Sequence, residues 1–270
     1  MPDRVLRKVW AYFDNAGPLV GRPWPIAYRG TDSERLAVLR ALGVRAFPAL
    51  AYPHKAGMAE WLNSWTLEFA SSYDDVVASA TMFPEPGVAD YLARAIDAGA
   101  RVVKVHVQVG GFDPRDPLLD PAWGLLAQTG TPVVIHAGSG PAPGAFTGPE
   151  PIREILLRHP GLRLVIAHLG MPEIDDFLAI ARENASVHLD TTMAFTDFAS
   201  GGREAAAALG DRLGPGLLAL QERIVLGSDF PNIPYPYAHQ LAALDRLGLG
   251  ADWLRAVCWD NGARLLGLAP

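Results

Sequence analysis

Short apolar runs rich in β-branched residues recur along the chain and predict buried β-strands. Continuous apolar character, without strict alternation, is typical of parallel strands covered on both faces. Turn-forming residues bound the runs, and their spacing is that of repeated strand–helix units. The predicted strands are residues 44–52, 76–83, 101–107, 132–136, 163–168, 186–190 and 223–229.

Amphipathic helical patterns fill the segments between these strands. The stretch TDSERLAVLRALG places Thr31 three residues before Glu34, which predicts a capping box, and it places Gly43 where the helix should end. The stretch VADYLARAIDAG ends in the same way at Gly99. Strands that alternate with helices predict an α/β protein built on a parallel sheet.

A TIM-type (β/α)8 barrel explains this pattern better than an open, doubly wound sheet. Polar residues follow several predicted strands, and the carboxyl ends of all barrel strands meet at one face. A dinucleotide-binding sheet would need a glycine-rich phosphate-binding sequence, which the chain lacks. The length of 270 residues suits one barrel domain over residues 1–270.

The number of predicted strands falls short of a closed barrel. Seven runs are found where eight are needed. The first segment, VLRKVWAYF, does not supply the eighth strand because its apolar residues follow helical spacing. We therefore expect a barrel whose first strand is missing from this sequence.

Charge and composition exclude several classes of partner. The net charge of −6, with Lys and Arg scattered, provides no basic stripe for nucleic acid. No stretch reaches the roughly 20 apolar residues that span a bilayer, and the N-terminus has no signal-peptide core. We expect a cytoplasmic protein with a small-molecule substrate, and a homodimer stays open. The single Cys258 excludes an internal disulfide, and its apolar surroundings predict a buried side chain.

Three polar residues at the ends of predicted strands are candidates for a metal site. His136, His168 and Asp229 provide imidazole and carboxylate donors that suit a divalent metal such as zinc. Such a metal lowers the pKa of a bound water, and a nearby His or Asp can transfer protons. Taken singly, each histidine is more often a structural residue, and Asp229 could instead cap a helix.

Four further residues are candidates for substrate binding. Lys104 and His106 share one face of their strand because side chains alternate along a strand. His54 follows the first predicted strand, and Trp61 could form an apolar wall of a pocket. Trp65 lies four residues after Trp61, a spacing more common in core packing.

Several motifs resemble the amidohydrolase superfamily, in particular the amidohydrolase-related branch that includes aminocarboxymuconate-semialdehyde decarboxylase. They are VVIHAGSG, LRLVIAHLG, VHLDTT, RIVLGSDFPNIPYP and DNGARLLGL, and the resemblance is good over residues 100–268. It implies a distorted barrel with one divalent metal, usually zinc, with manganese as the alternative. It also implies that His136 binds the metal, that His168 polarises the substrate or a metal-bound water, and that Asp229 binds the metal and accepts a proton.

The sequence departs from this family at its start. Family members carry a His-x-His pair on strand one, and this chain has no histidine before His54. His136 and Asp229 alone fall below the usual three protein ligands, although His54 could compensate. Three explanations stay open: an upstream segment carries strand one, the protein is a metal-free relative, or a partner chain fills the gap. We favour the first, because an open barrel would expose two strand edges.

The combined pattern predicts a metal-dependent hydrolase or non-oxidative decarboxylase. Its substrate would be a small organic acid or an ester-like compound, with His168 and Asp229 as catalytic residues. The alternative is a degenerate, metal-free barrel that binds a ligand without catalysis.

Overall fold

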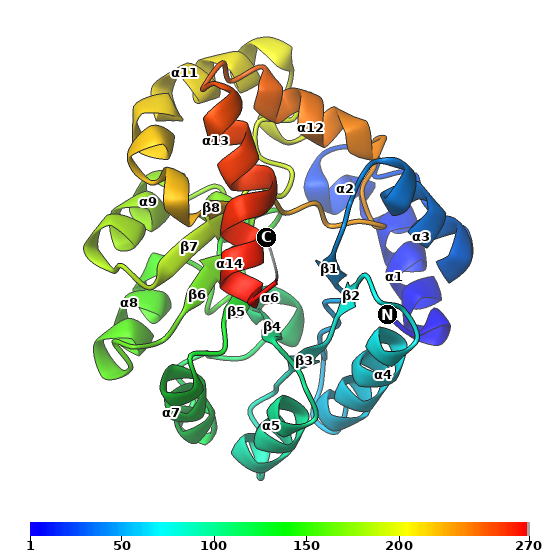
Figure 1. Ribbon diagram of the computed structural model, residues 1–270, viewed down its shortest axis with the longest axis vertical. Coiled ribbons are helices and arrows are strands. Elements are labelled where there is room, and N and C mark those ends of the chain that lie inside the picture. The colour runs from blue at the N-terminus through cyan, green and yellow to red at the C-terminus, as the bar shows by residue number, and fades with distance from the viewer. Residues whose placement is uncertain (269–270) are drawn as a thin grey trace. The chain divides into compact units, whose positions relative to one another are not determined.

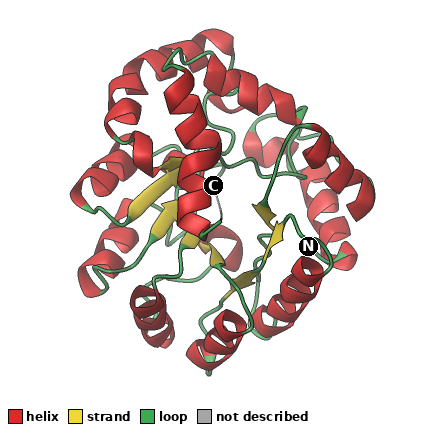
Figure 2. Ribbon diagram, in the orientation of Figure 1, coloured by secondary structure: helices red, strands yellow, loops and turns green. Residues whose placement is uncertain are grey.

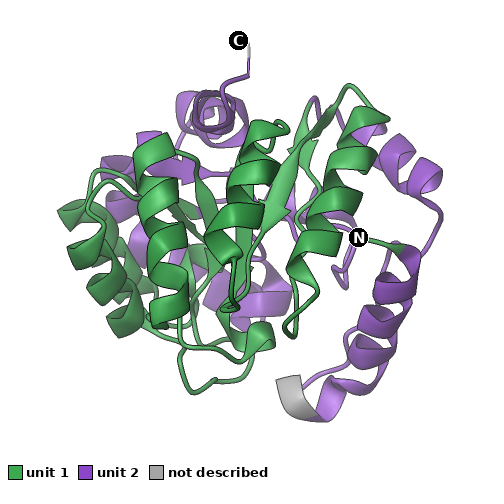
Figure 3. Cartoon of the chain, turned by 90° about the horizontal axis from the view of Figure 1, so that it is seen from below, with its two compact units in different colours: residues 1–2, 46–189 green, residues 3–45, 190–270 purple. Residues whose placement is uncertain are grey.

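The computed structural model describes residues 1–268, apart from the side chains of residues 19 and 20 (Figure 1). The chain divides into two compact units (Figure 3). Unit 1 comprises residues 1–2 and 46–189, and unit 2 comprises residues 3–45 and 190–270. Both units combine helices with strands (Figure 2). The single domain over residues 1–270 stays a prediction.

Unit 1 alternates strands with helices, as the hydrophobic pattern predicts. Its elements are β1 (Phe47–Pro48), α4 (Ala59–Ser71), β2 (Val76–Val77), β3 (Ser79–Thr81), α5 (Val88–Asp97), β4 (Val102–His106), α6 (Val107–Gly110), the 3-10 helix η1 (Pro117–Leu119), α7 (Asp120–Thr129), β5 (Val133–His136), α8 (Pro149–Arg158), β6 (Leu164–Ile166), the 3-10 turn η2 (Ala167–Gly170), α9 (Ile174–Glu183) and β7 (Val187–Asp190), whose last residue belongs to unit 2.

The strands of unit 1 pair in parallel and in chain order. β3 pairs with β4, and the ladder continues through β5 and β6 to β7, while β1 pairs with β2. The predicted run 76–83 divides into two short strands, because Ala78 leaves the ladder of β2 and its carbonyl accepts from Arg101 N–H at 2.9 Å. The centre of the ladder is apolar, with Val103, Val133 and Ile135 all 0% exposed.

Side chains from α4 complete the hydrogen bonds of β3 where β1 has already ended. The amide of Asn63 donates to the carbonyl of Thr81 at 3.1 Å and accepts from its N–H at 2.7 Å. The hydroxyl of Thr66 donates to the carbonyl of Ser79 at 2.6 Å. Because these backbone groups are buried, an apolar helix face would leave them unsatisfied.

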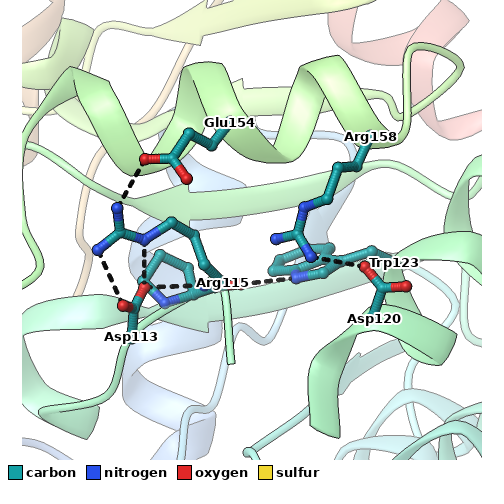
Figure 4. Close-up of polar contacts among 7 residues, drawn as sticks. Asp113, Arg115, Asp120, Trp123, Glu154 and Arg158 are labelled. Atoms are coloured by element: carbon teal, nitrogen blue, oxygen red, sulfur yellow. Dashed lines mark hydrogen bonds and ion pairs between the residues drawn. The ribbon is translucent and has the colours of Figure 1, made fainter. Parts of the chain in front are cut away.

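Ion pairs near the helix ends tie the segment after β4 to α8 (Figure 4). Arg115 bridges Asp113 at 2.8 Å and Glu154 at 2.7 Å, and Arg158 donates to Asp120 at 2.8 Å. These side chains are partly solvent-accessible, so each pair contributes at most about 1 kcal/mol. The contacts fix the path of the loop rather than the stability of the core.

Unit 2 is mostly helical and contains the N-terminal helix that the sequence predicts. Its elements are α1 (Asp3–Asn15), α2 (Gly17–Val20), α3 (Asp32–Ala41), α10 (Asp197–Ser200), α11 (Arg203–Ala219), the 3-10 helix η3 (Gln221–Arg223), β8 (Ile224–Val225), α12 (Tyr237–Asp245), α13 (Ala251–Arg255), the π-helical turn η4 (Ala256–Asp260) and α14 (Asn261–Leu266).

Two local predictions about unit 2 have opposite outcomes. The capping box at the start of α3 is confirmed, with reciprocal bonds between Thr31 and Glu34. The prediction of a buried Cys258 is wrong, because this side chain is exposed. Trp253 and Val257, each 1% exposed, face inward from the helix, so Cys258, the residue after Val257, points outward.

None of the helices in the described part of the chain combines the length and apolar character needed to cross a bilayer.

Replacing Asn63 with Ala should destabilise unit 1 by about 2–4 kcal/mol, because it leaves two buried backbone groups of Thr81 without partners. Urea unfolding followed by circular dichroism measures this change. Ser64→Ala on the same helix is the control, since the Ser64 hydroxyl bonds only within α4, and it should change stability by less than about 0.5 kcal/mol. Equal losses for the two variants would contradict the role of Asn63.

Candidate functional site

Three histidines from the ends of adjacent strands form a cluster in unit 1, here called the histidine row: His106, His136 and His168. The β4–β5 register places His106 opposite His136, and their rings stack with centroids 4.1 Å apart and planes inclined by 12°. The His168 ring meets His136 edge to face at 4.9 Å. The sequence therefore predicted correctly that these strand ends converge.

An unusual backbone conformation places His168 in the row. The chain turns directly after β6, with His168 at φ 57° and Leu169 at φ 54°. Left-handed conformations are uncommon for residues with side chains and gather at functional sites. Leu169 is fully buried and Gly170 follows, so packing holds the turn that presents His168.

Backbone partners define which ring nitrogen carries the proton in two of these histidines. His136 Nε2 lies 2.9 Å from the carbonyl of Gly140, which can only accept, so Nε2 carries the proton and Nδ1 keeps its lone pair. His106 Nδ1 accepts the N–H of Val109 at 3.3 Å, so its proton is on Nε2. Of the ring nitrogens that are not bonded to these backbone partners, Nδ1 of His136 is a hydrogen-bond acceptor and Nε2–H of His106 is a donor.

Burial keeps both of these imidazoles neutral. Desolvation, followed by the charges of His136, Lys104 and His168, lowers the pKa of His106 well below its usual 6.5. The pKa of His136 falls for the same main reason, with smaller effects from His168 and Lys104. Lys104 is 6% exposed, two residues before His106 on β4. A buried cation beside neutral imidazoles suits an anionic ligand.

Two glycines let the loop after β5 pack closely on the turn after β6. A Cβ on Gly138 would lie 2.7 Å from the Gly170 carbonyl and closer still to the Met171 oxygen. Gly140 N–H donates to the same Met171 oxygen at 3.1 Å. Ser139 adds two bonds to the Glu173 carboxylate, from its N–H at 3.0 Å and from its hydroxyl. The AGSG sequence thus fixes His136 relative to His168.

Asp229 lies in unit 2, in a tight turn after β8. It has φ 54°, its side chain is exposed, and its carbonyl accepts the N–H of Asn232 at 2.8 Å. The alternative role of Asp229 as a helix cap is wrong, since the next helix begins at Tyr237 with Pro236 at its cap.

Buried polar residues surround the end of β7 in unit 2. Asp190 is 6% exposed and accepts the N–H of Thr192 at 2.9 Å. A Cβ on Gly227 would lie 2.7 Å from the Asp190 carboxylate, so glycine is needed there. The Gln240 amide, 0% exposed, donates to the Thr191 carbonyl at 2.5 Å. The close approach at Gly227 thus packs the segment that leads from β8 to Asp229 against Asp190.

The remaining predicted residues lie in exposed positions. His54 is exposed in the loop after β1, and Trp61 is 40% exposed on α4. Their roles in substrate binding stay predictions. Sequence reasoning missed Tyr52, whose ring lies 4.7 Å from that of His106, and Glu173 with its bonds to Ser139. Alternation along the first strand was a signal for Tyr52, but nothing in the sequence pointed to Glu173.

The donors of the histidine row do not make a complete metal site. His136 has the features of a ligand, because Nδ1 keeps a lone pair while the other nitrogen bonds a carbonyl. The lone pair of His106 is instead directed to Val109 N–H. Over residues 1–268, no three His, Cys, Asp or Glu side chains are grouped to hold a metal ion. The residues present therefore do not fit the usual set of three protein ligands.

Comparisons with known proteins identify the family and the fold. The family model described as Amidohydrolase matches residues 8–268. No curated protein matched the chain. Among solved structures, an uncharacterized TIM-barrel protein from Bordetella bronchiseptica aligns with a TM-score of 0.76 and 18% identity, over 96% of this chain and 92% of its own.

Two further solved structures have names that refer to reactions. A provisionally named 2-pyrone-4,6-dicarboxylic acid hydrolase from Pseudomonas putida aligns with a TM-score of 0.66 and 18% identity, over 94% of this chain and 93% of its own. A 5-carboxyvanillate decarboxylase from Novosphingobium aromaticivorans, complexed with manganese and a nitrobenzoic acid, gives 0.65 and 15%, over 97% and 87%. At these identities the likeness concerns the fold, and the predicted TIM-type α/β fold is confirmed.

Replacing Gly138 with Ala should cost about 1–3 kcal/mol of stability, because the new Cβ would force the backbones at Gly138 and Met171 apart. Thermal unfolding measures the loss. Gly262→Ala is the control: Gly262 lies in α14 with open space around its Cα, so this variant should be neutral or stabilising by up to about 1 kcal/mol. A Gly138 variant as stable as the wild type would contradict the close approach.

The free energy of unfolding should fall as the pH drops from 7 towards 5. His106 and His136 stay neutral in the folded protein, whereas the unfolded chain binds protons near pH 6.5, so acid favours unfolding. Each group can contribute a slope of about 1.4 kcal/mol per pH unit below that value. Urea unfolding of chelator-treated protein at pH 7, 6 and 5 measures the slope. His136→Asn should reduce it, and an unchanged slope would contradict the lowered pKa values.

Proposed function

Because the chain belongs to the amidohydrolase family, we propose that it is an enzyme that hydrolyses or non-oxidatively decarboxylates a small organic acid or ester-like compound. The observation that carries the proposal is the histidine row beside buried Lys104, at the carboxyl ends of adjacent parallel strands. In this fold, active sites are built at that end of the strands.

Lys104 and His106 would bind the anionic part of the substrate. The Lys104 charge attracts a carboxylate, and in the assigned tautomer His106 offers the donor Nε2–H. Because both groups come from β4, their relative position is set by the strand rather than by a flexible loop. The stacked ring of His136 limits rotation of His106 and so fixes the direction of that donor.

His168 and Asp229 would move protons in the reaction. In hydrolysis, Asp229 accepts a proton from the attacking water, and His168 stabilises the oxyanion that forms at the carbonyl. In decarboxylation, a protonated His168 or Asp229 delivers a proton to the carbon that loses carbon dioxide. Both residues lie at backbone turns with positive φ, a conformation that functional sites often retain.

A divalent metal, zinc or manganese, is the finer part of the proposal. His136 could bind such a metal through Nδ1, and the decarboxylase from Novosphingobium aromaticivorans is complexed with manganese. Over residues 1–268 no three His, Cys, Asp or Glu side chains are grouped to complete such a site. The steps above therefore use the side chains of this chain alone.

A second candidate is a metal-free barrel that binds an organic acid without catalysis. The lack of a grouped set of three ligands over residues 1–268 favours it. In that case Lys104 and His106 would keep their roles in binding, whereas His168 and Asp229 would not be needed for affinity.

The proposal is tested with 2-pyrone-4,6-dicarboxylate and 5-carboxyvanillate, with zinc, with manganese and after chelation. We expect loss of substrate absorbance with one of the two compounds. Carbon dioxide should be released only if that compound is 5-carboxyvanillate. His168→Gln should lower kcat by about 10²–10⁴-fold, as expected for loss of a general acid or base. His159→Gln is the matched control and should leave kcat unchanged. His159 lies at the end of α8, where its ring bonds the side chain of Asp120.

Binding without turnover separates the two candidates. If calorimetry detects binding of a carboxylate that requires Lys104, yet no reaction occurs under any metal condition, the binding protein is supported. Equal kcat values for His168→Gln and the wild type would overturn the catalytic role of His168.

A further inference from the structure

We propose that two tryptophans near the N-terminus, Trp10 and Trp24, are positioning residues that hold the turn carrying Asp229. All the groups involved belong to unit 2. The clamp is defined as residues 10–28, and the Asp229 loop as residues 229–237. The proposal rests on the proposed function for the role of Asp229 and on hydrogen bonds within unit 2 for everything else.

Both indoles donate to the same residue of the loop. Trp10 Nε1–H donates to the side-chain oxygen of Asn232 at 3.1 Å, and Trp24 Nε1–H donates to its backbone carbonyl at 2.9 Å. Asn232 in turn closes the tight turn, because its N–H donates to the carbonyl of Asp229 at 2.8 Å. The two indoles thus hold Asn232 through both its side-chain oxygen and its backbone carbonyl.

Further contacts join the same two segments. Ala27 N–H donates to the carbonyl of Ile233 at 3.0 Å, and Ile233 is 0% exposed. The Tyr28 hydroxyl accepts the N–H of Tyr237 at 2.7 Å, and its ring lies 4.8 Å from that of Phe230. The clamp therefore contacts the Asp229 loop at several points along its length.

The tryptophan rings are themselves held in place. Trp24 stacks on Phe13 with centroids 5.0 Å apart and meets Phe198 edge to face at 5.0 Å. The guanidinium groups of Arg29 and Arg35 each lie 5.8 Å from the Trp10 ring, within the range of cation–π attraction. Fixed rings give the two indole N–H groups fixed directions.

The Asp229 loop has features that make external hydrogen bonds important for its conformation. Asp229 is exposed and has φ 54°, a left-handed conformation that is uncommon for residues with side chains and that surrounding contacts help to hold. The loop is rich in proline, FPNIPYP, so it has few backbone N–H groups with which to form internal hydrogen bonds. Instead, the indole N–H groups of the clamp donate to the side-chain oxygen and the backbone carbonyl of Asn232.

Hydrogen exchange of the peptide that covers residues 226–236 tests the clamp. Trp10→Phe and Asn232→Leu each remove one hydrogen bond, so exchange should become about fivefold to tenfold faster. Asn232→Asp keeps an acceptor for Trp10 and should restore near wild-type exchange. The double variant should exchange no faster than either single variant, because both remove the same bond.

The matched control is Trp253→Phe. It removes an indole bond to the Leu217 carbonyl, also in unit 2, and should leave exchange of residues 226–236 unchanged. Unchanged exchange in Trp10→Phe, or a double variant whose acceleration is the product of the two single effects, would overturn the proposal.

Kinetics of the reaction identified under the proposed function then separate positioning from general stability. Trp10→Phe should lower kcat at an unchanged KM, while Trp253→Phe should leave both unchanged. An unchanged kcat would show that the clamp does not position Asp229. If the wild type has no activity, the proposed function fails, and the exchange data alone decide whether the clamp holds the turn.

Discussion

The parallel register between β4 and β5 is the constraint on which the candidate site depends. It places His106 opposite His136, and the hydrogen-bonded ladder fixes the separation of the two rings. The same ladder continues to β6, whose end leads into the turn of His168. A shift of one residue between these strands would move each histidine to the other face of the sheet. Register thus determines the chemistry of the site as much as residue type does.

Glycine has the same physical role after strands of both units. Gly138 lets the loop after β5 approach the backbone of Met171, and Gly227 lets the segment after β8 approach Asp190. In both places a methyl group would overlap atoms of the neighbouring loop. Beyond the ends of the strands, the polar side chains lie close together because these loops pack closely. Without this packing, each loop would continue in the direction of its own strand.

The sequence predicted where the strands lie and the convergence of His106, His136 and His168, because apolar runs mark strands and parallel strands end at one side of the sheet. It overestimated strand length in the predicted runs 44–52 and 223–229, which contain strands of only two residues, Phe47–Pro48 and Ile224–Val225. It did not predict what depends on contacts between distant residues. The bonds of Asn63 to β3 and of Trp10 to Asn232 join segments far apart in the chain. The ring protons of His106 and His136 depend on backbone partners that no local pattern reveals.

The stacking of His106 on His136 also restricts how protons travel. Imidazole nitrogens form hydrogen bonds in the plane of the ring, and these two planes are inclined by only 12° with their faces together. A proton therefore has no direct path from one ring to the other. His106 Nδ1 and His136 Nε2 are further occupied by Val109 and Gly140. His106 and His136 therefore do not pass protons to each other, and a proton that His168 delivers to the substrate would not travel between these two rings.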